Sequence, residues 1–184
     1  MKRVFLIHGW EGYPEKDWFV WIKKELEQRG FNIVAPAMPD SMNPKMDAWV
    51  SHLAETVGTP DEETYFIGHS LGCITILRYL ETLQHNQKVD GAVLVAGFGS
   101  NLEYEGYENE LASFFQTPID WKEIKKHCAR FTAIHSEDDP FVPIKHNVLF
   151  QEKLGAKSII EQGSGHFDDK EYRVILEAFL SIVS

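Results

Sequence analysis

The chain has 184 residues, 43% of them hydrophobic and 25% charged, which is typical of one globular domain with a substantial core. Its formal net charge of −10 argues against a nucleic-acid partner, because such partners require a basic surface that neutralises phosphates. No apolar stretch approaches the roughly 20 residues of a membrane-spanning helix, so no membrane span is expected.

The first half of the chain alternates between short apolar runs and amphipathic helical patterns. Residues 3–7 predict a buried strand, and because this run is too short for a signal peptide we expect a cytoplasmic location. Tryptophans and aliphatic residues on one face predict a helix over 18–26, and residues 31–35 predict a second strand. Helical spacing then predicts a helix over 46–57, and residues 64–67 predict a third strand.

The second half continues this alternation. The third strand turns directly into a helical pattern over 73–83. Further strands are expected at 92–96, 131–134 and 158–160, and a last helix from about Asp168. Repeated strand–helix units, with strands that are apolar on both faces, predict an α/β fold. We expect a mostly parallel sheet of about six strands with helices on both faces.

The segment 98–126 departs from this rhythm. It combines acidic and aromatic residues with Pro118 and carries only short helical patterns. We interpret it as a short excursion over the sheet, so the whole chain, 1–184, is expected to form a single domain. The stretch from Phe98 to Phe115, together with Trp10, is a candidate lining for an acyl pocket.

The pentapeptide Gly68-His69-Ser70-Leu71-Gly72 matches the Gly-x-Ser-x-Gly nucleophile elbow and lies between a predicted strand and a predicted helix. A serine on a sharp, strained turn projects its hydroxyl from the sheet edge. Glycines on either side remove Cβ atoms that would clash with the neighbouring strand and helix. The N-terminal end of the following helix favours the negative charge that develops during acyl transfer. Ser70 is therefore the candidate nucleophile.

A serine nucleophile needs a base, and the base needs an orienting acid, here in the chain order serine, acid, histidine. His166 is the candidate base, because it follows the last predicted strand in the flexible loop 163–165. Asp139 is the preferred acid, because the proline directly after it fixes the turn. Asp138 stays open as an alternative, and Glu137 is a third candidate.

An oxyanion hole in this arrangement uses two backbone N–H groups. One is expected from Leu71, which follows the nucleophile, and the other from Trp10 in the loop after the first strand. Each such donor is typically worth about 100- to 1,000-fold in rate. We expect His8 to brace this loop and assign no task to His69, which fills the variable position of the elbow.

Other chemistries lack their motifs. No Gly-x-Gly-x-x-Gly follows the first strand, which argues against a dinucleotide-binding oxidoreductase. No Walker loop or zinc spacing is present, so neither a cofactor nor a metal is expected. Cys73 and Cys128 give no disulfide framework, and Cys73 falls in an apolar helical run typical of a buried thiol.

At this point the chain resembles the α/β-hydrolase superfamily along nearly its whole length. More narrowly, it is similar to the YdeN-like small serine hydrolases, the group that contains retinoblastoma-binding protein nine. The matching motifs are His8-Gly9-Trp10, Trp18-x-x-Trp21-x-Lys23-Lys24-x-Leu26, Met38-Pro39-Asp40, Gly68-His69-Ser70, Asp138-Asp139-Pro140-Phe141 and Gly165-His166-Phe167. The resemblance implies a minimal α/β-hydrolase fold without a large cap domain, and a triad of Ser70, Asp139 and His166.

These residues predict a serine hydrolase that acts on a small-molecule ester, or on an amide or thioester, through an acyl-serine intermediate. The resemblance also implies a second hypothesis, since proteins of this group have been associated with protein binding. The chain would then be a protein-binding module with a hydrolase fold whose role does not depend on turnover. Replacing Ser70 with alanine separates the two hypotheses.

Overall fold

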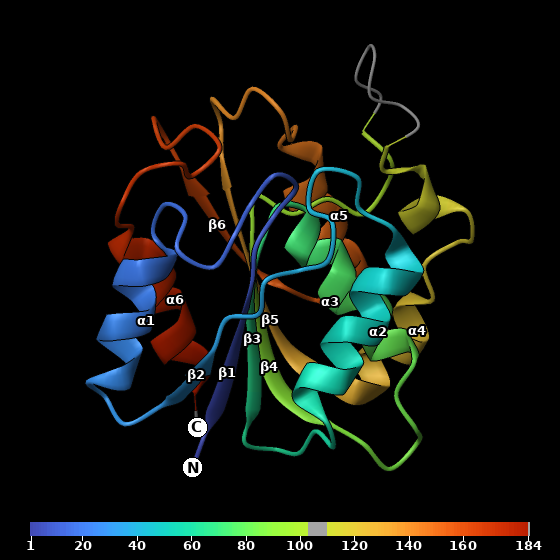
Figure 1. Ribbon diagram of the computed structural model, residues 1–184. Coiled ribbons are helices and arrows are strands. Elements are labelled where there is room, and N and C mark those ends of the chain that lie inside the picture. Colours follow the sequence, from blue (N-terminus) through green and yellow to red (C-terminus); the bar gives the residue numbers. More distant parts are fainter. Residues whose placement is uncertain (103–109, 184) are drawn as a thin grey trace.

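The computed structural model describes residues 1–102 and 110–183, and its centre is one sheet of six parallel strands (Figure 1). The strands lie in the order β2-β1-β3-β4-β5-β6. Their bounds are β1 (Arg3–Ile7), β2 (Asn32–Val34), β3 (Thr64–His69), β4 (Val89–Val95), β5 (Cys128–Ser136) and β6 (Lys157–Glu161). The helices are α1 (Phe19–Glu27), α2 (Met46–Val57), α3 (Leu71–Glu81), α4 (Trp121–His127), α5 (Lys145–Leu154) and α6 (Arg173–Ile182), with a short 3-10 helix, η1 (Ala112–Phe115).

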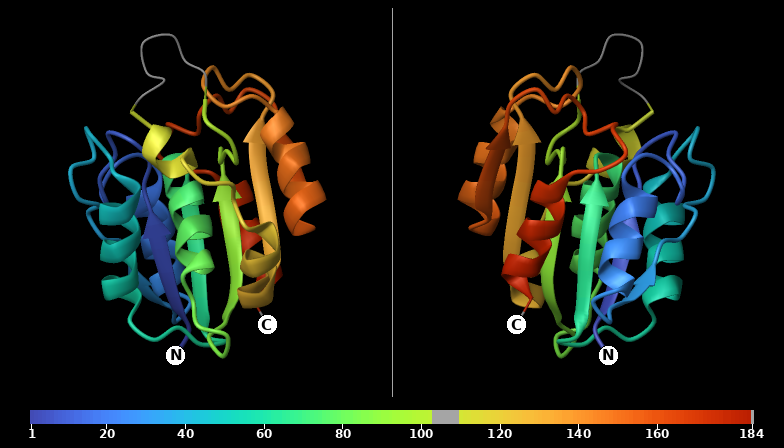
Figure 2. Two further views of the ribbon diagram at one scale, coloured as in Figure 1. Left: turned by 90° about the vertical axis from the view of Figure 1, so that its right-hand side faces the viewer. Right: turned by 90° about the vertical axis from the view of Figure 1, so that its left-hand side faces the viewer.

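Helices cover both faces of the sheet, which confirms the arrangement predicted from the strand–helix alternation. Helices α1 and α6 pack on one face, and α2, α3, α4 and α5 pack on the other (Figures 1 and 2). Each face has its own apolar cluster. Trp18 and Phe179 are buried in the first, and Trp49 and Phe66 in the second. Strands enclosed on both sides must be apolar on both faces, which explains their near-continuous hydrophobic runs.

Strand β3 lies near the middle of the sheet, and all six of its residues are buried. It pairs with β1 on one side and β4 on the other, and its register with β4 ends at His69↔Val95. Because all strands are parallel, their carboxyl ends meet at one edge of the sheet, where the loops after β1, β3, β5 and β6 converge (Figure 1). Open parallel sheets bind ligands at this edge.

Two helices differ from the sequence-based expectation. Helix α6 begins at Arg173 instead of near Asp168, because residues 168–171 are polar and exposed and offer no apolar face for a first turn. Helix α5 is the second, because the sequence pattern predicts no helix over residues 145–154. It buries His146 and Asn147 against the sheet, so polar residues occupy positions where an apolar stripe would have marked a helix.

The expected excursion at 98–126 is described in part, since residues 103–109 lie outside the described residues. Its later portion contains η1 and α4, and α4 packs beside α3. The buried side chain of Arg78, on α3, donates hydrogen bonds to the carbonyl oxygens of Phe114 at 2.7 Å and Thr117 at 2.6 Å. A buried guanidinium thus fastens the excursion to the helix that follows Ser70.

Candidate active site

Ser70 occupies a strained turn between β3 and α3. Its backbone has φ 52° and ψ −117°, a combination that residues other than glycine rarely adopt. Its N–H donates to the carbonyl oxygen of Val95 on β4 at 2.9 Å, which ties the turn to the neighbouring strand. The local geometry is that of the nucleophile elbow predicted from the pentapeptide.

Three glycines allow the backbone to approach this turn closely. A Cβ on Gly72 would lie 2.1 Å from the carbonyl oxygen of Ile7, and one on Gly68 would lie 2.9 Å from the backbone nitrogen of Cys73. A Cβ on Gly9 would lie 3.0 Å from the Cβ of Ser70. The elbow therefore requires glycine where the helix crosses the end of β1.

His166 follows β6 and contacts Asp139, which follows β5. The Nδ1 of His166 lies 2.9 Å from Oδ2 of Asp139, whose side chain is fully buried. The other carboxylate oxygen, Oδ1, accepts the N–H groups of Phe141 at 2.8 Å and Val142 at 2.9 Å. These bonds fix the carboxylate and leave Oδ2 for the imidazole, so Nδ1 carries the proton and Nε2 is left as a base.

Asp138 has a different set of partners. Its Oδ1 accepts the N–H of Gly163 at 3.0 Å, the N–H of Gly165 at 3.2 Å and the hydroxyl of Ser136. The Ser136 hydroxyl first, and the backbone N–H groups with it, lower the pKa of this carboxyl below its ordinary value. Asp138 thus holds the loop before His166, and the structure brings Asp139 to the imidazole.

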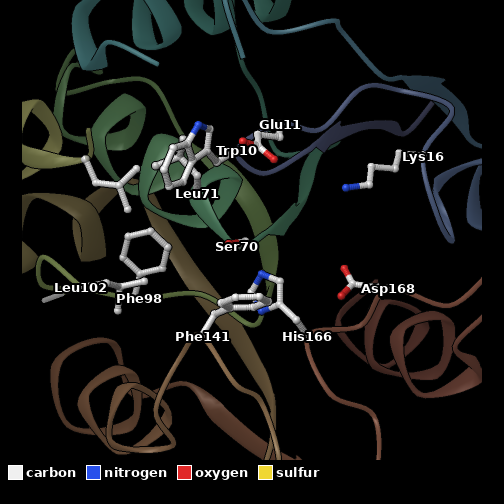
Figure 3. A pocket seen from close by; sticks show the side chains of 11 residues that line it. Trp10, Glu11, Lys16, Ser70, Leu71, Phe98, Leu102, Phe141, His166 and Asp168 are labelled. Carbon is white, nitrogen blue, oxygen red and sulfur yellow. The ribbon is translucent and has the colours of Figure 1, made fainter. Parts of the chain in front are cut away.

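Ser70 and His166 line one cavity of about 490 Å³ at the carboxyl edge of the sheet (Figure 3). Apolar side chains lie to one side of Ser70 and charged ones to the other (Figure 3). The apolar side chains labelled there are Trp10, Leu71, Phe98, Leu102 and Phe141, and the charged ones are Glu11, Lys16 and Asp168; Leu111 also lines the cavity. No hydrogen bond joins the Ser70 hydroxyl to His166 within the described ranges, an arrangement common before substrate binds.

The candidate oxyanion donors stand at this cavity. Leu71 is the first residue of α3, so its N–H has no partner within the helix. Trp10 lies in the loop after β1, and its indole N–H donates to the carbonyl oxygen of Met42 at 3.1 Å. Both candidate residues line the same cavity as Ser70.

His8 braces the loop that carries Trp10. Its Nε2 accepts the N–H of Met38 at 3.0 Å, which requires the proton on Nδ1, and Nδ1 donates to the carbonyl oxygen of Gly9 at 2.8 Å. Burial lowers the pKa of this imidazole, so the ring is neutral and the two bonds keep their direction at neutral pH.

One residue at the site was given no task by the sequence pattern. His69 is buried, and its Nε2 lies 2.7 Å from the main-chain carbonyl oxygen of His166. The contact joins positions 97 residues apart in the chain, so neither local spacing nor the elbow motif indicates it.

The described residues contain neither a cluster of histidine, cysteine and acidic side chains suited to a metal ion nor a helix long and apolar enough to cross a membrane. Cys73 and Cys128 are buried as free thiols, and burial raises the pKa of both.

Known proteins resemble this chain in sequence over most of its length. Residues 4–177 match a family model described as serine hydrolase. The serine hydrolase RBBP9 of Rattus norvegicus is 36% identical over 179 residues, which cover 96% of this chain and 88% of that protein. YdeN of Bacillus subtilis (strain 168) is 33% identical over 170 residues, with coverage of 92% and 88%.

Solved structures extend the likeness to the fold. The crystal structure of the ydeN gene product from B. subtilis matches with a TM-score of 0.92 and 30% identity, over 99% of this chain and 98% of that one. Est1E from Butyrivibrio proteoclasticus with ferulic acid bound matches with a TM-score of 0.77 and 14% identity, over 99% and 89%. The second match concerns the fold alone. Together they confirm the expected α/β-hydrolase fold, and residues 1–102 and 110–183 form no large cap domain.

Proposed function

The chain belongs to the serine hydrolase family, and from this premise we propose that it cleaves small carboxylic esters at Ser70 through an acyl-serine intermediate. The cavity carries this proposal. One space of about 490 Å³ is lined by the partly exposed Ser70, by the His166 imidazole that the buried Asp139 carboxylate orients, and by a wall of apolar side chains.

In the first half of the reaction, the Ser70 oxygen attacks the ester carbonyl carbon, and Nε2 of His166 takes the hydroxyl proton. Asp139 holds the imidazole with Nδ1 protonated and stabilises the imidazolium that forms. The carbonyl oxygen becomes negative and accepts hydrogen bonds from the N–H groups of Leu71 and Trp10. When the carbon–oxygen bond to the alcohol breaks, His166 returns its proton to the departing oxygen.

In the second half, water replaces the alcohol. His166 removes a proton from the water, whose oxygen bonds to the acyl carbon. The tetrahedral intermediate then collapses, the bond to Ser70 breaks and the proton passes from His166 to the serine oxygen. The products are a carboxylic acid and free enzyme, and no redox partner is needed.

The apolar side of the cavity supports an ester with a compact hydrophobic group. Phe98 and Leu111 are nearly fully buried, and together with Leu71 they form an apolar wall of the cavity. Burying a hydrophobic group there contributes about 0.8 kcal/mol per methylene, so affinity should rise with chain length until the space is filled.

The test combines a fluorophosphonate probe, which reacts with activated serines, with nitrophenyl esters of increasing acyl length. Wild type, Ser70→Ala and His166→Ala are compared at neutral pH. Labelling and turnover in wild type that both variants lose would support the proposal. A folded wild type that neither labels nor turns over any ester would contradict it and favour the protein-binding alternative.

A further inference from the structure

His69 joins the two halves of the candidate site. It ends β3 and directly precedes Ser70, while its Nε2 reaches the main-chain carbonyl oxygen of His166 at 2.7 Å. A carbonyl oxygen can only accept, so Nε2 of His69 carries the proton and donates it to this bond. The residue therefore links the backbone that presents the nucleophile with the backbone that presents the base.

The His69 ring is held from two sides. Its centroid lies 4.9 Å from that of His166, and the edge-on indole of Trp18 lies 5.9 Å away. Burial, and then the neighbouring His166, lower the pKa of His69 to about 3. The ring thus stays neutral over the range in which a hydrolase works and adds no positive charge beside the imidazole that must accept a proton.

Apart from the bond that the Tyr172 hydroxyl donates to the carbonyl oxygen of Ser164 at 3.3 Å, the other hydrogen bonds to the His166 loop from outside it come from β5 and the loop after it. Asp138 accepts the N–H groups of Gly163 and Gly165, and the Ser136 hydroxyl oxygen accepts the N–H of Ser164 at 3.1 Å. All of these partners belong to the end of β5 or to the loop after it, and so does the acid Asp139. They fix the base relative to the acid and do not fix it relative to Ser70.

We propose that His69 is a positioning residue of the hydrolase, whose Nε2–H bond to the His166 carbonyl sets the separation between the imidazole and Ser70. This inference rests on the proposed function. A misplacement of about 1 Å in a reacting pair can lower the rate about 100-fold, so one bond at this junction is enough to matter. His69 does not line the cavity of about 490 Å³; it lines only a smaller pocket of about 50 Å³ that shares Ser70 and His166 with that cavity, so substrate binding should change little.

The experiment uses His69→Leu, which removes the donor, and His69→Gln, whose side-chain amide can place an N–H near the position of Nε2. His127→Leu is the matched control. His127, the last residue of α4, is also buried, and its Nδ1 lies 2.7 Å from the carbonyl oxygen of Gln87, but it directly precedes β5 and so lies at the amino-terminal edge of the sheet, away from Ser70. Steady-state kcat and KM on a nitrophenyl ester are measured alongside thermal unfolding, at a temperature where each variant is folded.

We expect His69→Leu to lower kcat about 10- to 100-fold with KM changed less than about twofold. His69→Gln should recover most of kcat, and His127→Leu should lower the unfolding temperature without lowering kcat. An unchanged kcat in folded His69→Leu overturns the proposal. So does a loss in folded His69→Gln as large as in His69→Leu, or an equal loss of kcat in His127→Leu. Ser70→Ala separates the two levels, because full turnover in that variant would overturn the proposed function itself.

Discussion

Replacing Gly72 with alanine should damage stability and activity together, because its backbone rests on the end of β1. The added Cβ would lie 2.1 Å from the carbonyl oxygen of Ile7 and 2.8 Å from that of His8. An ordinary contact begins at 3.4 Å, so helix and strand must separate by about 1.3 Å. Both clashing atoms are backbone, and no side-chain rotation relieves them.

We expect Gly72→Ala to lower the free energy of unfolding by about 3 kcal/mol. The displacement also moves the loop that carries Trp10 away from Leu71. It should therefore lower kcat/KM by about 100-fold in the fraction that remains folded. Urea unfolding followed by tryptophan fluorescence measures the first effect, and hydrolysis of a nitrophenyl ester, corrected for the folded fraction, measures the second.

Gly155→Ala is the matched control. Gly155 ends α5 with φ 69°, and a Cβ built there meets no atom within 4 Å. Its replacement should cost about 1 kcal/mol from the left-handed backbone alone and leave kcat/KM unchanged. The steric reasoning is refuted if Gly72→Ala unfolds like wild type and keeps its activity, or if both variants lose activity equally.

The remaining predictions concern the acids, the cavity and acid stability. Asp139→Asn should lower kcat about 10,000-fold by favouring the wrong imidazole tautomer, whereas Asp138→Asn should lower it less than about tenfold; equal losses on one ester would contradict this division of roles. Phe98→Ala should move the preferred acyl chain of a nitrophenyl ester series to greater length, and an unchanged preference would show that Phe98 does not bound the substrate. Burial lowers the pKa of His146 from 6.5 to about 4, so the unfolded chain binds its proton first, and this contribution to stability is complete above pH 6.5 and lost as pH falls toward 4. His146→Gln should accordingly reduce the pH dependence of the unfolding free energy by about 1 kcal/mol per pH unit between about pH 6 and 4.5, as urea titrations at each pH would reveal, and an unchanged pH dependence would contradict this account.

Local sequence patterns predict most of the fold and the candidate nucleophile. The elbow is recognisable because glycine, serine and strand–helix context all fall within a few residues, and the structure gives Ser70 the strained backbone that this motif implies. The choice between Asp138 and Asp139 depends on which carboxylate reaches a residue 27 positions away. No spacing rule contains that information, so the proline after Asp139 favoured one candidate without excluding the other.

Polar burial explains the main omission. Helix α5 presents Asn147 to the sheet, where its side-chain N–H groups donate to the carbonyl oxygen of Ala133 at 3.1 Å and its Oδ1 accepts the hydroxyl of Ser158. The Nδ1 of His135 lies 3.1 Å from the same amide nitrogen. Phe150 and Leu154 are the two apolar residues among those that α5 buries, so the helix is anchored partly by hydrogen bonds and hydrophobic spacing alone does not detect it.

The division of hydrogen bonds around His166 means that the site consists of two mechanical units. Asp139 and His166 should move as one unit, because Asp138 and Asp139 in the loop after β5 bond to the loop after β6. The nucleophile travels with α3 and the middle of the sheet. A conformational fluctuation during substrate entry or product release should therefore alter the distance between Ser70 and the imidazole, while the distance between the Asp139 carboxylate and the imidazole stays constant. The hydrogen bond from His69 to the His166 carbonyl oxygen would limit this change.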